Sequence, residues 1–154
     1  DIVWHFLGNI QSNKLKDIVN YADLVQSIGR KKIYDKLINM SDKLEKNILL
    51  QLKLGNEASK SGFSKSEINN IIENHPKDCA VKIKGLMVIA EGGLAEMEIN
   101  NQFAFANDFF RSIKQINEDI EYLSMGMSND YDIALTNGSN MIRIGTSLFG
   151  SRNK

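Results

Sequence analysis

The stretches Leu123-Ser124-Met125-Gly126-Met127-Ser128 and Met141-Ile142-Arg143-Ile144-Gly145-Thr146 carry the strongest structural signal in the chain. Each is a short apolar run that ends in glycine and hydroxyl residues. The pattern predicts strands at Ile120–Met125 and Met141–Ile144, with a helix over Asp130–Asn137 between them. Two neighbouring strands that end in such residues are typical of a phosphate-binding site in a barrel. The arginine within the second strand also needs an acceptor, because an isolated buried cation is costly.

The same alternation of apolar runs and helical patterns extends over the whole chain. Continuously apolar strands separated by helices indicate a parallel sheet covered on both faces, so the expected fold class is α/β. An open doubly wound sheet and a (β/α)8 TIM barrel both fit six βα units, and a six-unit barrel would leave two edges unpaired. The other expected strands are Val3–Leu7, Leu24–Ile28, Ile48–Leu54 and Ile83–Ile89. The other expected helices are Asn13–Tyr21, Arg30–Lys46, the segment after the capping box Ser64–Glu67, and Asn101–Asn117.

Composition excludes several kinds of partner. The 19 basic and 19 acidic side chains cancel among 154 residues, which argues against nucleic acid or an anionic membrane as the main partner. No apolar run is long enough to cross a bilayer. The single cysteine, Cys79, excludes an internal disulfide and fits a reducing compartment, which predicts a cytoplasmic protein. Because Asp1 lacks a preceding methionine and lies in a strand-like run, we expect residues 1–154 to be the C-terminal part of a single domain.

The candidate site lies where α/β proteins bind their ligands, at the carboxyl ends of the strands. These positions carry hydroxyls, glycines and cations without a carboxylate, which favours an anion-binding pocket over hydrolysis by paired acids. The chain has no Gly-x-Ser-x-Gly elbow, P-loop or dinucleotide fingerprint, and two histidines with one cysteine make a structural zinc site implausible. The strand-end residues are His5 with Gly8-Asn9, Ser27, Lys53 with Gly55, Met87, Ser124–Ser128 and Arg143–Thr146.

Several of these residues admit a structural role beside a binding role. Gly145-Thr146 can present amides and a hydroxyl to a phosphate, or can form a plain turn. Ser128 is either a phosphate ligand or the N-cap of the following helix. Arg143 either meets the ligand or pairs with a strand carboxylate, and for His5 a half-buried structural role is the simpler expectation. The phosphate interpretation is favoured because its motifs end adjacent strands.

Two further segments are given roles other than holding the phosphate. His75, beside Pro76 at a helix end, is interpreted as a helix terminator. Glu91–Glu98, which contains Gly92-Gly93, is expected to form a mobile loop over the site.

Five motifs follow one another along the chain: Trp4-His5-Phe6-Leu7-Gly8-Asn9-Ile10-Gln11-Ser12-Asn13-Lys14, then Glu57, Lys60, Ser61, Gly62 and Phe63, then Lys84-Gly85-Leu86-Met87, Ser124–Asp130 and Gly138–Arg152. Together they resemble the YggS/PROSC family of pyridoxal 5′-phosphate (PLP) homeostasis proteins. The resemblance covers the whole chain and is specific, because the motifs also agree in spacing.

The resemblance implies a PLP-binding barrel of fold type III, similar to the N-terminal domain of alanine racemase, with about six of the eight βα units present. It implies that Arg143 faces the pyridine nitrogen and that Ser128 with Gly145-Thr146 holds the phosphate. The implied function is PLP binding in intracellular vitamin B6 homeostasis, as a carrier or buffer without established catalysis, so neither a catalytic residue nor a metal ligand is expected. The expected cofactor-binding residues are Arg143, Gly145, Thr146, Ser128, Met127 and His5.

The chain also departs from the family pattern. The family's aldimine lysine and its Gly-Glu-Asn-Arg segment precede the matched region, so we expect PLP binding by this chain to be weak or absent. Asn140 replaces a threonine, Lys53 an asparagine and Gly29 an aspartate. The expected partners are PLP, PLP enzymes that lack their cofactor, and a second copy of the chain at the open barrel edges. The alternatives are an amino-acid racemase or decarboxylase of the same fold and a barrel for another phosphorylated metabolite.

Overall fold

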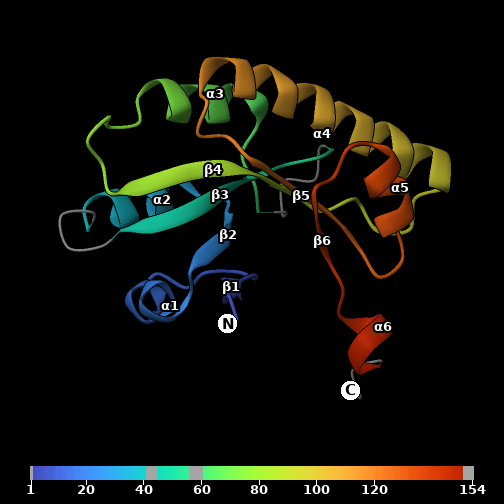
Figure 1. Ribbon diagram of the computed structural model, residues 1–154, viewed down its shortest axis with the longest axis horizontal. Coiled ribbons are helices and arrows are strands. Elements are labelled where there is room, and N and C mark those ends of the chain that lie inside the picture. The colour runs from blue at the N-terminus through green and yellow to red at the C-terminus, as the bar shows by residue number, and fades with distance from the viewer. Residues whose placement is uncertain (1, 41–44, 56–60, 151–154) are drawn as a thin grey trace.

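The fold is a single curled sheet with helices packed along its convex side (Figure 1). The computed structural model describes residues 2–40, 45–55 and 61–150, and within these ranges strands and helices alternate from one end to the other. The elements are β1 (His5–Phe6), α1 (Leu15–Tyr21), β2 (Leu24–Ile28), α2 (Lys31–Ile38), β3 (Lys46–Leu52), α3 (Lys65–Glu73), β4 (Val81–Val88), α4 (Glu96–Ile116), β5 (Tyr122–Met127), α5 (Tyr131–Thr136), β6 (Met141–Arg143) and α6 (Thr146–Phe149).

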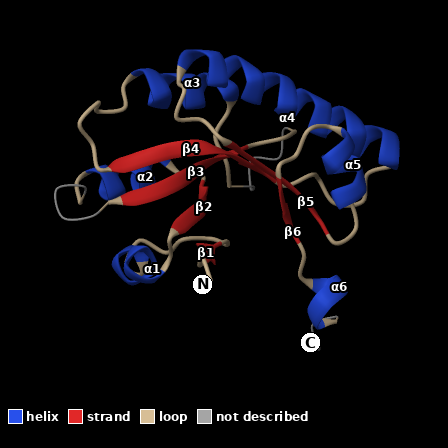
Figure 2. Cartoon of the chain, in the orientation of Figure 1, coloured by secondary structure: helices blue, strands red, loops and turns tan. Residues whose placement is uncertain are grey.

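The strand order distinguishes the two predicted architectures. All neighbouring strands pair in parallel, and their order in the sheet is β1-β2-β3-β4-β5-β6, the same as in the chain. A doubly wound sheet reverses its order at a switch point, whereas a barrel does not. The sheet curls without closing, and β1 and β6 form its two edges (Figure 2). The predicted α/β class and the partial (β/α)8 barrel are therefore confirmed.

The two faces of the sheet carry different side chains. Leu50, Leu86 and Leu123 belong to the large apolar core under the helices, which includes the fully buried Phe103 of α4. A second apolar group comes from other positions of the strands, so it lies on the concave face. Because side chains alternate between the faces of a strand, residues two positions further along these strands also face the concave interior. The second group consists of Leu24, Leu49 and Met87, with Tyr122 and Met141 packed against them.

Most predicted elements agree with the structure in bounds and length, and three differ in one or the other. The helix expected over Arg30–Lys46 ends at Ile38, and Lys46 instead begins β3, where it pairs with Val81. Residues 41–44 of this expected helix lie outside the described residues. The strand expected over Val3–Leu7 has only two residues, and it is an edge strand with one neighbour.

The third difference is the start of α4. It begins at Glu96 instead of Asn101, because Glu98 accepts the backbone N–H of Ala95 at 2.9 Å and so stabilises an earlier helix start. The predicted loop over Glu91–Glu98 is therefore shorter than expected. Within the described ranges, no helix combines the length and apolar character needed to span a membrane.

Two predicted helix signals are confirmed. Ser64 and Glu67 form the capping box: the Ser64 N–H donates to Glu67 Oε2 at 2.7 Å, and the Glu67 N–H donates to Ser64 Oγ at 3.3 Å. Gly138 follows α5 with φ +86°, the left-handed conformation that favours glycine after a helix.

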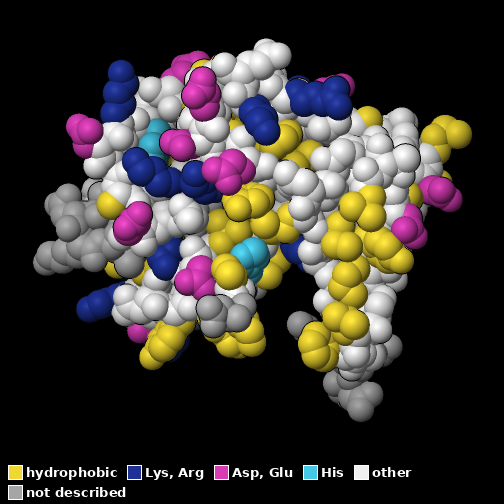
Figure 3. Space-filling model, in the orientation of Figure 1, with side chains coloured by type: hydrophobic (Ala, Val, Ile, Leu, Met, Phe, Trp, Pro, Cys, Tyr) yellow, Lys and Arg dark blue, Asp and Glu magenta, His cyan; other side chains and the backbone are white. Residues whose placement is uncertain are grey.

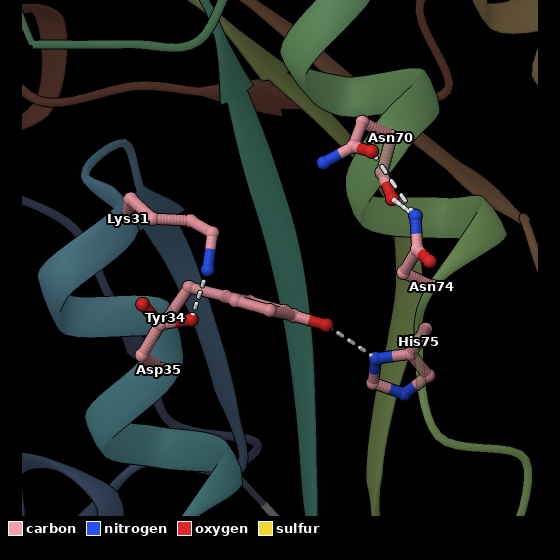
Figure 4. Close-up of polar contacts among 6 residues, drawn as sticks. All are labelled: Lys31, Tyr34, Asp35, Asn70, Asn74 and His75. Atoms are coloured by element: carbon pink, nitrogen blue, oxygen red, sulfur yellow. Dashed lines mark hydrogen bonds and ion pairs between the residues drawn. The ribbon is translucent and has the colours of Figure 1, made fainter.

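His75 has a larger role than a helix terminator. Its ring bridges two elements. Nδ1 lies 2.7 Å from the hydroxyl of Tyr34 on α2 (Figure 4), and Nε2 lies 2.8 Å from the carbonyl oxygen of Val81, which begins β4. A carbonyl only accepts, so Nε2 carries the proton and Tyr34 donates to Nδ1. Burial lowers the pKa of His75 and raises that of Tyr34 to about 12.

Candidate functional site

A cavity of about 530 Å³ lies at the carboxyl ends of β4, β5 and β6. The loops that follow these three strands form most of its wall, and the loop after β1 adds Leu7. This is the edge at which parallel α/β sheets bind ligands. The lining residues are Leu7, Ala90, Glu91, Gly92, Gly93, Ile99, Met127, Ser128, Asn129, Asp130, Arg143, Ile144, Gly145 and Thr146.

Arg143 is the cation of this cavity. Its Nη1 donates to Ser124 Oγ at 2.9 Å, and its Nη2 donates to the carbonyl oxygen of Val88 at 2.8 Å. Burial lowers the pKa of Arg143 to about 10, and the charge of Asp130 opposes that shift. The guanidinium is therefore charged at neutral pH, and its hydrogen-bond partners among the described residues, Ser124 and Val88, are uncharged. The alternative of a strand carboxylate as its partner stays a prediction.

Ser128 connects the two loops that carry the predicted phosphate residues. Its hydroxyl oxygen accepts the backbone N–H groups of Gly145 at 3.3 Å and Ser147 at 3.2 Å. It is not the N-cap of the following helix, because α5 begins at Tyr131 and Asp130 occupies that position. Amides after β6 thus point at an oxygen acceptor on the loop after β5, which is the arrangement that an anion requires.

Gly126 explains why the loop after β5 can turn at this point. Its φ is +94°, and a Cβ there would lie 2.6 Å from the Cβ of Ala134 and 2.9 Å from the Cα of Tyr131. Only glycine allows α5 to approach the end of β5 this closely. The turn places Met127 and Ser128 on the cavity wall.

Five of the six predicted cofactor-binding residues line one cavity, and the sixth does not. Met127, Ser128, Arg143, Gly145 and Thr146 line it. His5 is exposed on β1 and is connected to the cavity only through hydrogen bonds. Its Nδ1 lies 2.9 Å from Gln26 Nε2, and Gln26 Oε1 accepts from Ser124 Oγ at 2.6 Å.

Other predicted strand-end residues have separate places. Ser27 donates to the carbonyl oxygen of Gly8 at 2.6 Å and so holds the loop after β1. Met87 is buried in the apolar group of the concave face. Lys53 lines a neighbouring hollow of about 420 Å³, which shares Ala90, Gly92 and Met127 with the cavity. The motif residues Glu57, Lys60 and Arg152 lie outside the described residues.

The sequence interpretation missed two features of the site. The interpretation considered the strand ends themselves for carboxylates, and it missed that Glu91 and Asp130 line the cavity just beyond β4 and β5. Asp130 Oδ1 accepts the N–H of Met127 at 2.5 Å. Gln26 was also not selected, although an amide within the apolar run of β2 signals a polar contact on one face of that strand.

Comparison with known proteins gives the relationship directly. The family model of the alanine racemase N-terminal domain matches residues 2–153. The pyridoxal phosphate homeostasis protein of Haemophilus influenzae is 38% identical over 162 residues, which cover 99% of this chain and 66% of that protein. The protein of the same name from Synechocystis is 36% identical and is covered to 71% of its length, with 99% of this chain aligned.

A solved structure shows the same fold at similar identity. PipY of Synechococcus elongatus, solved with PLP bound, is 33% identical with a TM-score of 0.86, over 97% of this chain and 71% of that chain. The chain thus spans about two thirds of the length of the curated relatives that it matches. It belongs to the family of the alanine racemase N-terminal domain, and within it to the pyridoxal phosphate homeostasis proteins.

Proposed function

We propose that this chain contributes the phosphate-binding and ring-facing half of a PLP site in a single barrel domain, and that the protein serves PLP homeostasis. The observation that carries the proposal is the pairing, in one cavity, of a charged Arg143 that has uncharged partners with amides of the Gly145 loop directed at Ser128. The names of the relatives and the PLP in PipY support the same ligand.

The donor set fits the two ends of this cofactor. A phosphate oxygen can replace Ser128 Oγ as acceptor for the amides of Gly145 and Ser147, with the hydroxyl of Ser128 turned to donate to it. Arg143 can donate to the pyridine nitrogen, because it presents several N–H groups in one plane. A guanidinium that only donates keeps that nitrogen unprotonated.

This arrangement favours carriage of the cofactor over its use in catalysis. PLP supplies an aldehyde and an electron-accepting ring to the enzymes that use it, and the ring accepts electrons best when its nitrogen is protonated. Arg143 works against that protonation. We therefore propose a carrier or buffer role without turnover.

We further propose a cytoplasmic location, transfer of PLP to enzymes that lack it, and self-association through the edges β1 and β6. The free, buried Cys79 supports the cytoplasmic location. Exposed apolar side chains along the sheet edges support self-association: Trp4 is 63% exposed next to β1, and Leu148 and Phe149 of α6 are 71% and 87% exposed. Figure 3 shows the apolar strip along the C-terminal arm.

Equilibrium titration of PLP, pyridoxal and inorganic phosphate into the chain tests the proposed site. We expect PLP to bind more tightly than pyridoxal, which lacks the phosphate. Loss of a charged hydrogen bond costs about 1.5–3 kcal/mol, so Arg143→Met is expected to weaken PLP binding by about 10- to 100-fold. Ser128→Ala is expected to weaken PLP and inorganic phosphate alike.

Arg111→Met is the matched control, because Arg111 is exposed on α4 away from the cavity lining. It is expected to bind PLP as the wild-type chain does. Equal losses for Arg143→Met and Arg111→Met, or equal binding of PLP and pyridoxal by the wild-type chain, would contradict the proposed site.

A further inference from the structure

Four polar side chains form a hydrogen-bonded series across the concave face of the sheet. Arg143 Nη1 lies 2.9 Å from Ser124 Oγ, and Ser124 Oγ lies 2.6 Å from Gln26 Oε1. Gln26 Nε2 then lies 2.9 Å from Nδ1 of His5. Since β2 and β5 are not neighbours in the sheet, the bond between Gln26 and Ser124 crosses the interior of the half-barrel.

We propose that Gln26 is a positioning residue for Arg143. Its side-chain oxygen, through the hydroxyl of Ser124, holds the guanidinium toward the cavity, and the Nδ1 of His5, as the acceptor of its NH₂ group, fixes the orientation of the amide. The inference rests on the proposed function in that the positioned guanidinium is the one assigned to the ring nitrogen.

The donors of this series all point in one direction. Arg143 can only donate, so Ser124 Oγ accepts from it and uses its own proton toward Gln26 Oε1. The side-chain oxygen of Gln26 is thereby fixed as an acceptor. The NH₂ group of Gln26 faces two acceptors, His5 Nδ1 and, with 3.2 Å between Nε2 and the sulfur, Met141 Sδ. The network thus assigns the amide orientation and the His5 tautomer with its proton on Nε2.

Because Gln26 and Ser124 are buried, each hydrogen bond of the series depends on the direction of the others. Gln26 is 1% exposed and Ser124 is fully buried, so a partner lost within the series cannot be replaced by bulk water. If the Gln26 amide turned over, its NH₂ group would face the Ser124 hydroxyl. The Ser124 proton would then lack its acceptor, and the contact that orients Arg143 would weaken.

The series has one end at solvent, because His5 is exposed. Its Nδ1 accepts from the NH₂ group of Gln26 at 2.9 Å, so the orientation of the buried amide depends on an exposed ring.

Substitution of Gln26 tests the positioning role. Gln26→Leu removes the acceptor of Ser124, and we expect PLP to bind about tenfold more weakly while inorganic phosphate binds as before. Gln51→Leu is the control, since Gln51 is a partly buried glutamine on the neighbouring strand β3 and donates instead to the carbonyl oxygen of Ser61. Unchanged PLP binding by a folded Gln26→Leu variant, or an equal loss in Gln51→Leu, would overturn the proposal.

The conservative variant Gln26→Glu separates positioning from a merely structural role. Its carboxylate keeps an acceptor for the Ser124 hydroxyl, so we expect it to bind PLP more tightly than Gln26→Leu does. Equal PLP binding by the two variants contradicts the series.

Nitrogen NMR of the ligand-free chain decides the inference even if PLP binding by this chain is too weak to measure, an outcome that concerns only the proposed function. We expect His5 at pH 8 to carry its proton on Nε2. We expect the guanidinium protons of Arg143 to exchange with water more slowly in the wild-type and Gln51→Leu chains than in Gln26→Leu. Equal exchange in all three chains would refute the positioning role.

Discussion

Replacement of Tyr34 by phenylalanine tests the bridge between α2 and the start of β4. The His75 ring donates from Nε2 to the carbonyl oxygen of Val81, so its Nδ1 depends on the Tyr34 hydroxyl, 2.7 Å away, for a donor. Tyr34 is 6% exposed, and the variant leaves this nitrogen without its partner. We expect the free energy of unfolding at pH 8 to fall by about 1–2 kcal/mol.

The same hydroxyl predicts a pH dependence with a definite sign. Burial raises the pKa of Tyr34 from 10.0 to about 12. The unfolded chain therefore loses the Tyr34 proton first, so the stability from this group is fully present below pH 10 and is lost as pH rises through 12. At pH 11 the loss is at most about 1.4 kcal/mol, and less where solvent screens the hydroxyl. The advantage of the wild-type chain over Tyr34→Phe should narrow accordingly between pH 8 and pH 11.

Urea unfolding followed by far-ultraviolet circular dichroism at the two pH values measures both effects. Tyr21→Phe is the matched control, because Tyr21 is 83% exposed and its removal should leave both values unchanged. A stability difference between wild type and Tyr34→Phe that is the same at pH 8 and pH 11 would refute the reasoning from a buried donor.

Two further stability predictions follow from single residues. Gly126→Ala adds a Cβ only 2.6 Å from that of Ala134 at φ +94°, so it should lower the free energy of unfolding by more than about 1 kcal/mol in thermal unfolding. Gly92→Ala, whose Cβ meets nothing within 4 Å, should lower it little. Equal losses in the two variants would contradict the close-approach argument. Burial lowers the pKa of His75, so the unfolded chain takes up its proton first and the stability from this group is lost as pH falls below about 6.5. The urea midpoint should therefore drop between pH 7.5 and pH 5 more in wild type than in His75→Gln, and an equal drop would count against a buried neutral ring.

The periodicity of the sequence was sufficient for the order and type of the elements. Leu24–Ile28 is a strand with the predicted bounds, and the hydroxyl of Ser64 and the carboxylate of Glu67 begin the helix where predicted. These signals are local, since they depend on neighbours within one turn or one strand. Periodicity failed at Lys46, where pairing with Val81 in the sheet overrides a helical pattern.

The choice between a doubly wound sheet and a barrel lay beyond periodicity. Both architectures have the same alternation of strands and helices, and they differ in which strands become neighbours. That order depends on tertiary packing, and here it is sequential from β1 to β6. The family resemblance, carried by motifs, indicated the barrel where residue patterns left both alternatives open.

The sequence by itself was sufficient to select residues that line one candidate cavity: Arg143, Ser128, Gly145 and Thr146 are grouped in two motifs at the ends of consecutive strands. Only the tertiary structure decided their partners. Gln26 lies 98 residues from Ser124 in the chain, and the curl of the sheet brings the two within 2.6 Å. Contacts across a barrel interior depend on register and curvature, which no local pattern records. For that reason the residues were predictable, whereas the support of Arg143 by Ser124 and Gln26 was not.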